Sequence, residues 1–226
     1  MMPFFFGPSS RPLYGVLDPA AGGSRSGVVL CQPAGSEYFF AHRSCRLLAR
    51  RLAEAGVHAL RFDPSGTGDS GGEVEDVTPA DWIADVGLAI EELRASAAVR
   101  AVTLVGLRGG CSTVLAAGLP EPLVESVVLW DPLPLEEPVI GAPDDFPSIS
   151  EALSSDGADD PRDVLIVRTS GTEPGPIDEA LRVYGHDLDT VDVEEAGAWE
   201  RGNGIGSLPV PARSIDTIVR WIGSRA

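Results

Sequence analysis

The sequence predicts a single domain of the α/β class, with a mostly parallel sheet covered by helices on both faces. Three observations support this prediction. Short apolar runs bounded by turn residues alternate along the chain with segments of helical periodicity. The runs at 27–31, 57–62 and 124–130 are predominantly apolar, which is typical of strands buried on both faces of a sheet. The chain has 226 residues, 43% of them hydrophobic, which is enough for one substantial core.

The first half of the chain predicts four strands and two helices. The strands are expected at 4–6, 13–17, 27–31 and 57–62, separated by turn-rich segments. The segment 38–55 has leucines at helical spacing and ends before Gly56, so it predicts a helix. A second helix is expected through Leu93, because Thr78 can cap it and Pro79 suits the first helical position.

The second half alternates more regularly. Strands are expected at 101–105, 124–130, 164–168 and 188–193, and helices at 110–117, 177–184 and 211–222. From 133 to 162, prolines, acidic residues and small residues dominate, and only 149–153 suggests a short helix. We expect this acidic segment to be a loop or minimal flap, so that residues 1–226 form one domain with a minimal or absent cap. The prediction is therefore an eight-stranded sheet flanked by helices.

The composition excludes several classes of function. A formal net charge of −17 argues against nucleic acid as a partner. Every basic residue is an arginine, so no lysine is available for a phosphate-binding loop or a Schiff base. Because the three cysteines lack paired spacing and the three histidines are scattered, we expect neither a metal nor a cofactor. No apolar run is long enough to span a membrane, so a cytoplasmic protein without a membrane partner is expected.

The stretch 105–111 (VGLRGGC) follows a predicted strand and enters a predicted helix. A strand that breaks at a glycine-flanked residue and enters a small-residue helix has the layout of a nucleophile elbow, G-x-S-x-G. The glycines make room for a strained backbone. Here Arg108 occupies the position of the serine. Because ligands bind at the carboxyl ends of the strands in such sheets, this turn marks the candidate site.

Four stretches occur in an order that resembles the α/β-hydrolase superfamily. They are FFFGPSSRPLYGVLDP, VVLCQPAGSEYFFAHRSCRLLARRLAEAGVHALRFDPSGTGDSGG, VGLRGG and VVLWDP. More narrowly, they resemble the serine-aminopeptidase-like hydrolases encoded beside exosortase systems and in bacterial natural-product gene clusters. The resemblance is detailed through Pro132 and weak beyond it. It implies the α/β-hydrolase fold.

In that superfamily a serine, a histidine and an acid form a triad that performs acyl transfer. The resemblance places the serine site at Arg108, the acid after the seventh strand at Glu173, and the histidine site near Trp199. Asp131 ends the sixth strand, where some hydrolases keep their acid. The last histidine, His186, precedes the eighth strand, so ordinary triad hydrolysis is not expected.

Two interpretations of Arg108 stay open. Its guanidinium is charged at any relevant pH, so it cannot act as a nucleophile or base. It can hold a carboxylate or phosphate, or stabilise a developing oxyanion. Alternatively, it fills the former active site through an ion pair with Asp131 or Glu173. Nearby, Cys111 is expected to be a small buried thiol and Ser112 a support for the first helical turn.

The loop at 33–37 has the position of an oxyanion loop, so backbone amides around Ala34 and Gly35 are expected to face the pocket. The expected substrate-binding residues are Ala34, Gly35, Ser36, Glu37, Leu107, Gly109 and Trp199. His42 follows directly. It is the one histidine that we consider as an acid or base, although a position on the helix surface is favoured.

Three functions are compatible with these residues. We favour an atypical enzyme of bacterial natural-product or polysaccharide biosynthesis that acts on an acyl, ester or carboxylate-bearing small molecule, free or bound to a carrier protein, by cyclisation, elimination or isomerisation. Its catalytic candidates are Arg108, Asp131, Glu173 and His42. The alternative is an inactive accessory protein whose arginine stripe docks an acidic partner; the stripe consists of Arg43, Arg46, Arg50 and Arg51. The third is a residual hydrolase or thioesterase that uses Cys111 or Ser112.

Overall fold

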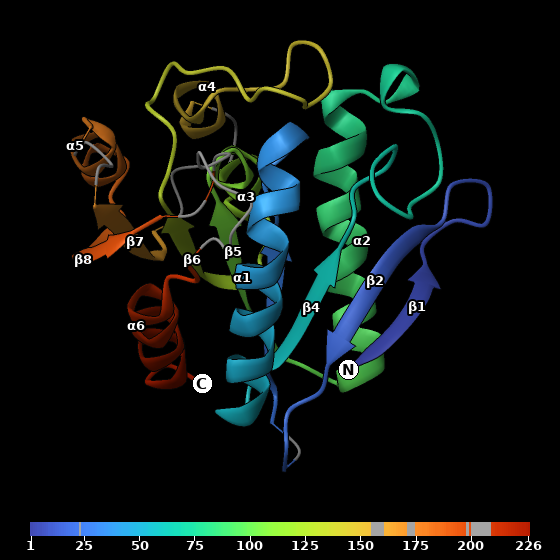
Figure 1. The fold of residues 1–226 in the computed structure, drawn as a ribbon, viewed down its shortest axis with the longest axis horizontal. Helices are drawn as coiled ribbons and strands as arrows, with labels where there is room; N and C mark the ends of the chain where they lie inside the picture. Colours follow the sequence, from blue (N-terminus) through green and yellow to red (C-terminus); the bar gives the residue numbers. More distant parts are fainter. Residues whose placement is uncertain (23, 155–160, 171–174, 198, 200–208) are drawn as a thin grey trace.

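The computed structural model describes residues 1–22, 24–154, 161–170, 175–197, 199 and 209–226. Within them the chain forms an eight-stranded sheet in the order β1-β2-β4-β3-β5-β6-β7-β8 (Figure 1). The strands are β1 (Met2–Phe6), β2 (Leu13–Asp18), β3 (Ser26–Cys31), β4 (His58–Phe62), β5 (Ala101–Leu107), β6 (Val124–Trp130), β7 (Asp163–Ser170) and β8 (Asp187–Ala196). β2 is antiparallel to both of its neighbours, and the other neighbouring strands pair in parallel, which confirms the predicted, mostly parallel sheet.

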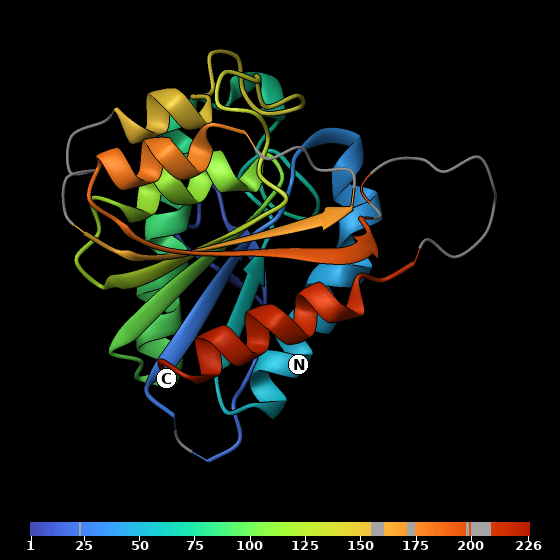
Figure 2. The ribbon, with the colours of Figure 1, turned by 90° about the vertical axis from the view of Figure 1, so that its left-hand side faces the viewer.

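Helices cover both faces of this sheet. They are α1 (Gly35–Glu54), α2 (Pro79–Ala97), α3 (Gly110–Gly118), α4 (Ile149–Leu153), α5 (Ile177–Val183) and α6 (Ala212–Gly223). α1 and α6 pack together on one face, whereas α3 lies on the other face with α2, α4 and α5 (Figure 2). None of the described helices combines the length and apolar character needed to cross a membrane.

The core consists of two apolar layers, one on each face of the sheet. In β3, Val29 belongs to the layer beneath α2 and α3, whereas Val28 and Leu30 belong to the layer beneath α1 and α6. β5 divides Leu104 and Val105 between the two layers in the same way. Because helices cover both faces, successive residues of these strands are all buried, and the strands read as continuous apolar runs.

The elements follow the predicted order, and the differences lie at their ends. α1 begins at Gly35 rather than at residue 38, because part of its first turn lines a cavity instead of the core and so carries no apolar periodicity. The cap expected at Thr78 is present: its hydroxyl accepts from the Asp81 N–H, and the Asp81 carboxylate accepts from the Thr78 N–H. A short 3-10 turn at Val74–Asp76 was not predicted.

The segment that was expected to be a minimal flap is a loop from 133 to 148, which we call the flap, followed by the predicted short helix α4. The flap is held on the body of the domain by a small apolar cluster. In that cluster the ring of Phe146 contacts Trp82 of α2 edge-on, with ring centroids 5.5 Å apart. The flap lies over the carboxyl ends of the central strands, where the elbow is.

Candidate functional site

The predicted elbow is present between β5 and α3. Arg108, at its tip, has a backbone φ of +53°, a left-handed conformation that is strained for any residue with a Cβ. A Cβ at Gly106 would lie 2.5 Å from the carbonyl oxygen of Gly110, and a Cβ at Gly110 would collide with the carbonyl of Cys31. The turn therefore has the tight geometry of a nucleophile elbow and requires glycine on both sides of Arg108.

The Arg108 side chain is directed at the first turn of α1. Its Nε and Nη2 each lie 3.1 Å from Oε1 of Glu37, and both side chains are largely buried. The ion pair with Asp131, one of the alternatives for a filled site, is therefore wrong, because Glu37, at the end of the oxyanion loop, brings its carboxylate alongside the elbow. The other partner expected for Arg108, Glu173, lies outside the described residues.

Asp131 follows β6 and is fully buried, with a φ of +46°. Its Oδ1 accepts from the Thr169 N–H at 2.6 Å, and its Oδ2 accepts from the Thr169 hydroxyl at 2.7 Å. Oδ2 also accepts from the indole Nε1 of Trp199 at 2.6 Å. In a triad, the acid receives this bond from the ring N–H of the histidine. Trp199 donates a bond of this kind to Asp131, and its indole N–H cannot take up or release a proton as an imidazole does.

A cavity of about 720 Å³ opens beside the elbow, and we call it the elbow cavity. It is lined by Ala34, Ser36, Glu37, Phe39, Phe40, Gly109, Leu133, Glu137, Pro138, Val139, Ile140 and Trp199. Five of the expected substrate-binding residues are in this set. Of the remaining two, Leu107 is buried in the core layer beneath α1, and Gly35 lies against the flap. Arg108 is not among the lining residues; it contacts one of them, Glu37.

The sequence did not predict the part of the wall that comes from the flap. A Cβ at Gly109 would lie 2.6 Å from Cγ1 of Val139, and a Cβ at Gly141 would lie 2.5 Å from the Cα of Gly35. The Val139 side chain therefore packs against the elbow, and the flap backbone at Gly141 packs against the oxyanion loop, as closely as glycine allows. The apolar residues at 133–140 and the aromatic pair Phe39-Phe40 are visible in the sequence, but nothing in their spacing indicated that they would line this cavity.

The charges around the elbow cavity are mixed. The N-terminal ends of α1 and α3, at Ala34 and Gly109, both border it, and helix N-termini favour negative charge. Arg108 adds a fixed positive charge, whereas Glu37 and Glu137 contribute carboxylates. Within the described residues, no group of three or more His, Cys, Asp or Glu side chains is placed to hold a metal ion.

Three other candidate residues lie apart from this arrangement. His42 is an exposed residue of α1 that lines a different cavity, and partial burial of its ring lowers its pKa. Cys111 is fully buried, its thiol donates to the carbonyl of Gly106, and burial raises its pKa. Ser112 is also buried, and its hydroxyl donates to the carbonyl of Pro147. The expectation of a buried thiol is confirmed, whereas the Ser112 hydroxyl bonds to the flap rather than to the first turn of α3.

Comparison with known proteins shows the fold. No protein-family model matches the sequence, and no curated protein matches it. Among solved structures, Est1E from Butyrivibrio proteoclasticus with ferulic acid bound has a TM-score of 0.68 at 15% identity, over 98% of this chain and 97% of that one. A serine hydrolase homologue from Coxiella burnetii gives 0.68 at 12% identity, over 99% and 96%. A lidless α/β serine hydrolase from Xanthomonas campestris gives 0.66 at 16% identity, over 99% and 93%.

Proposed function

We propose that this chain is an enzyme that acts on an acyl, ester or carboxylate-bearing small molecule without forming an acyl-enzyme. It has the α/β-hydrolase fold, and its elbow carries a cation where a nucleophile would be expected. The reaction is a cyclisation, an elimination or an isomerisation. One observation carries the proposal: the elbow cavity is open beside an intact turn whose tip is Arg108, and the buried Asp131 nearby accepts from Trp199 rather than from a histidine.

The absence of an acyl-enzyme follows from the groups near the elbow. The guanidinium of Arg108 cannot attack a carbonyl. Cys111 and Ser112 are buried and engaged with backbone carbonyls, and burial disfavours the thiolate that would make Cys111 a nucleophile. Trp199 cannot take the proton from an attacking group.

The electrostatics favour a ligand that carries or develops negative charge. Arg108 can form charge-assisted hydrogen bonds to a carboxylate or an enolate oxygen, and the helix N-termini at Ala34 and Gly109 add to the same field. Proton transfer falls to the carboxylates of Glu37 and Glu137, which line the cavity. Before a ligand carboxylate can bind to Arg108 it must displace Glu37, so these two residues have opposite effects on affinity.

The cavity wall favours a ligand with an apolar or aromatic body. Phe39, Phe40, Val139 and Trp199 contribute much of the wall, and such surfaces gain free energy when they bury apolar groups. The solved structure of Est1E, which has the same fold, holds ferulic acid. Ferulic acid, an aromatic carboxylate, and its methyl ester are therefore suitable first probes, together with a series of fatty acids.

The test measures binding of these carboxylates by calorimetry. We expect wild-type protein to bind at least one of them, and Arg108→Ala to weaken that affinity by about tenfold or more, because a charged hydrogen bond is lost. Glu37→Gln should tighten binding, because it frees the guanidinium. Arg11→Ala is the matched control: it also removes an arginine from an ion pair, with Asp81, and should leave affinity unchanged.

Two results would overturn the proposal. The first is hydrolysis of methyl ferulate with a burst of methanol, or a covalent adduct with a fluorophosphonate, since either requires a nucleophile. The second is a carboxylate affinity that Arg108→Ala and Glu37→Gln leave unchanged, since the guanidinium would then have no part in recognition.

The second candidate is an accessory protein that binds without catalysis, and the bond from Trp199 to Asp131 favours it because it fills the histidine site with a group that cannot transfer protons. Its partner would be acidic, such as a carrier protein that presents the substrate, and would dock on the exposed arginines of α1, which are Arg43, Arg46, Arg50 and Arg51. Charge reversal of these arginines should then abolish co-purification, whereas the enzyme proposal requires turnover by the isolated chain. The resemblance to hydrolases of bacterial biosynthetic gene clusters supports a biosynthetic role in either case.

A further inference from the structure

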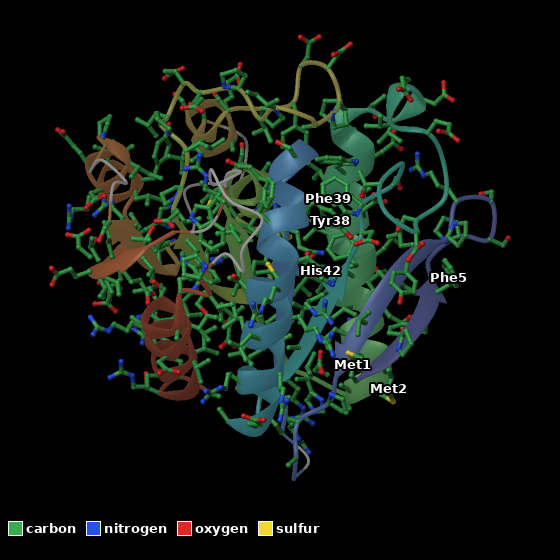
Figure 3. The ribbon with its side chains drawn as sticks, viewed as in Figure 1. Met1, Met2, Phe5, Tyr38, Phe39 and His42 are labelled. Atoms are coloured by element: carbon green, nitrogen blue, oxygen red, sulfur yellow. The ribbon has the colours of Figure 1, made fainter. Side chains whose placement is uncertain are left out.

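A second cavity, of about 220 Å³, lies between α1 and the strands β2 and β4, and we call it the side cavity. α1 contributes Tyr38, His42 and Arg46, which are spaced four residues apart and therefore share one face of the helix. Arg61 of β4 lines it from the sheet. Figure 3 shows Tyr38 and His42 following one another along α1, with Met1 near the end of β2.

Arg61 is an unusual residue for its position. It occupies a core strand, and its side chain is only 4% exposed. Within the described residues its ion-pair partner is Asp18, whose Oδ2 lies 3.7 Å from Nη2, a separation longer than a hydrogen bond. Nη2 otherwise contacts the thioether sulfur of Met1 at 4.0 Å, and the buried Nε has no hydrogen-bond partner in the described part of the chain. A buried guanidinium with so little compensation favours an additional negative partner.

The acidic residues of the side cavity do not provide that partner. Asp63 is buried, and both of its carboxylate oxygens are engaged: Oδ1 accepts from the Tyr38 hydroxyl at 2.8 Å, and Oδ2 accepts from the Asp69 N–H at 3.1 Å. Asp69 itself is exposed to solvent. Arg46, on the opposite wall, is exposed and has no ion pair within the described residues. Two guanidinium groups therefore line one small cavity.

We propose that the side cavity binds a small oxyanion, a carboxylate or phosphate group, between Arg61 and Arg46. The volume is that of about seven water molecules, which accommodates inorganic phosphate or a short carboxylic acid. This site is distinct from the elbow cavity, because the two cavities share no lining residue. The inference therefore does not depend on the proposed function.

His42 provides a direct readout of occupancy. Partial burial lowers its pKa, and the positive charges of Arg61 and Arg46 lower it further, whereas Asp63 raises it. A bound anion offsets the two arginines and so must raise the pKa of His42. The other two histidines are internal controls, because neither lines the side cavity. Nδ1 of His58 accepts from the Ala20 N–H, and Nδ1 of His186 accepts from the Arg162 N–H.

The test is a proton NMR titration of the three histidines in inorganic phosphate, in acetate, and in sodium chloride at the same ionic strength. We expect phosphate, acetate or both to raise the pKa of His42 by about 0.5 or more relative to chloride, with His58 and His186 unchanged. Arg46→Ala and Arg61→Gln should each weaken the response about tenfold or more. The matched control is Arg43→Ala, which removes an exposed arginine of the same helix and should leave the response intact.

The phosphate and acetate titrations distinguish which oxyanion the side cavity binds. A response to phosphate alone assigns a phosphate group, and a response to acetate alone assigns a carboxylate. The proposal fails if neither anion moves the His42 resonance beyond the chloride control, or if Arg43→Ala weakens the response as much as Arg46→Ala does. Arg46 is exposed, so its variant carries the test even if Arg61→Gln does not fold.

Discussion

Trp199 is predicted to stabilise the fold through its bond to Asp131. The carboxylate of Asp131 is fully buried, and the indole N–H lies 2.6 Å from Oδ2. Trp199→Phe removes this donor and some of the ring that packs edge-on against Trp130, with centroids 5.2 Å apart. A hydrogen bond to a charged group contributes about 1.5–3 kcal/mol, and the smaller ring adds a packing loss. We expect the free energy of unfolding to fall by about 2–4 kcal/mol.

The chain contains a matched control for this substitution. Nε1 of Trp221 donates to Oδ2 of Asp189 at 2.7 Å, but this bond is on the surface and the Asp189 side chain is 57% exposed. Water can replace the indole there, so Trp221→Phe should cost about 0.5 kcal/mol or less. The two substitutions remove the same donor from the same kind of acceptor. Their difference therefore measures what burial of the Asp131 carboxylate contributes.

The assay is urea unfolding followed by far-ultraviolet circular dichroism, since fluorescence would change with the number of tryptophans. A double-mutant cycle with Asp131→Asn isolates the pairwise interaction, and we expect a coupling energy of about 1–2 kcal/mol. If Trp199→Phe costs no more than Trp221→Phe, or if the coupling is within error of zero, the bond does not hold the site together. The view of Trp199 as a structural replacement for a catalytic base would then be wrong.

Three further predictions follow from the same structure. Arg108→Gly should unfold at the same urea concentration as wild type or a higher one, because glycine adopts a φ of +53° without strain, worth up to about 1 kcal/mol, while carboxylate affinity falls. Iodoacetamide at pH 8 should leave all three cysteines of the native protein unlabelled by mass spectrometry, because burial raises their pKa, to about 12 in Cys31 and Cys45; rapid labelling would contradict this. The bonds from Arg11 and Thr78 hold the pKa of Asp81 well below its usual range, so Asp81→Asn should be less stable than wild type at pH 6 and the gap should close as pH falls below about 4.

Most of the fold was predictable, because strands buried on both faces and capped helices leave direct marks on the sequence. β3 and β6 read as apolar runs since helices cover both of their faces, and Thr78 with Pro79 marked the start of α2. The start of α1 was misplaced because part of its first turn faces the elbow cavity, where polar and small residues replace the apolar pattern. Apolar periodicity indicates burial in the core, so it does not mark the part of a helix that borders a cavity.

The site was predictable only where backbone geometry determines the residue type. Gly106 and Gly110 marked the elbow because a side chain at either position would collide with neighbouring backbone. The partner of Arg108 was not predictable, because Glu37 is 71 residues away and only the packing of α1 against the elbow brings the two together. The flap presents the same difficulty: its close approach depends on Gly141, one glycine among the 26 in the sequence, and nothing in the sequence marks it.

The backbone of the elbow bears on the choice between an active and a filled site. Arg108 holds a left-handed conformation that costs about 1 kcal/mol or more for a residue with a Cβ, and that glycine adopts freely. A turn that only joined β5 to α3 would gain stability from glycine at its tip. Strain of this kind is characteristic of sites where a particular side chain must be presented in a particular direction. Here it directs a cation toward Glu37 on the wall of an open cavity, and a ligand carboxylate that displaced Glu37 would take its place beside the guanidinium.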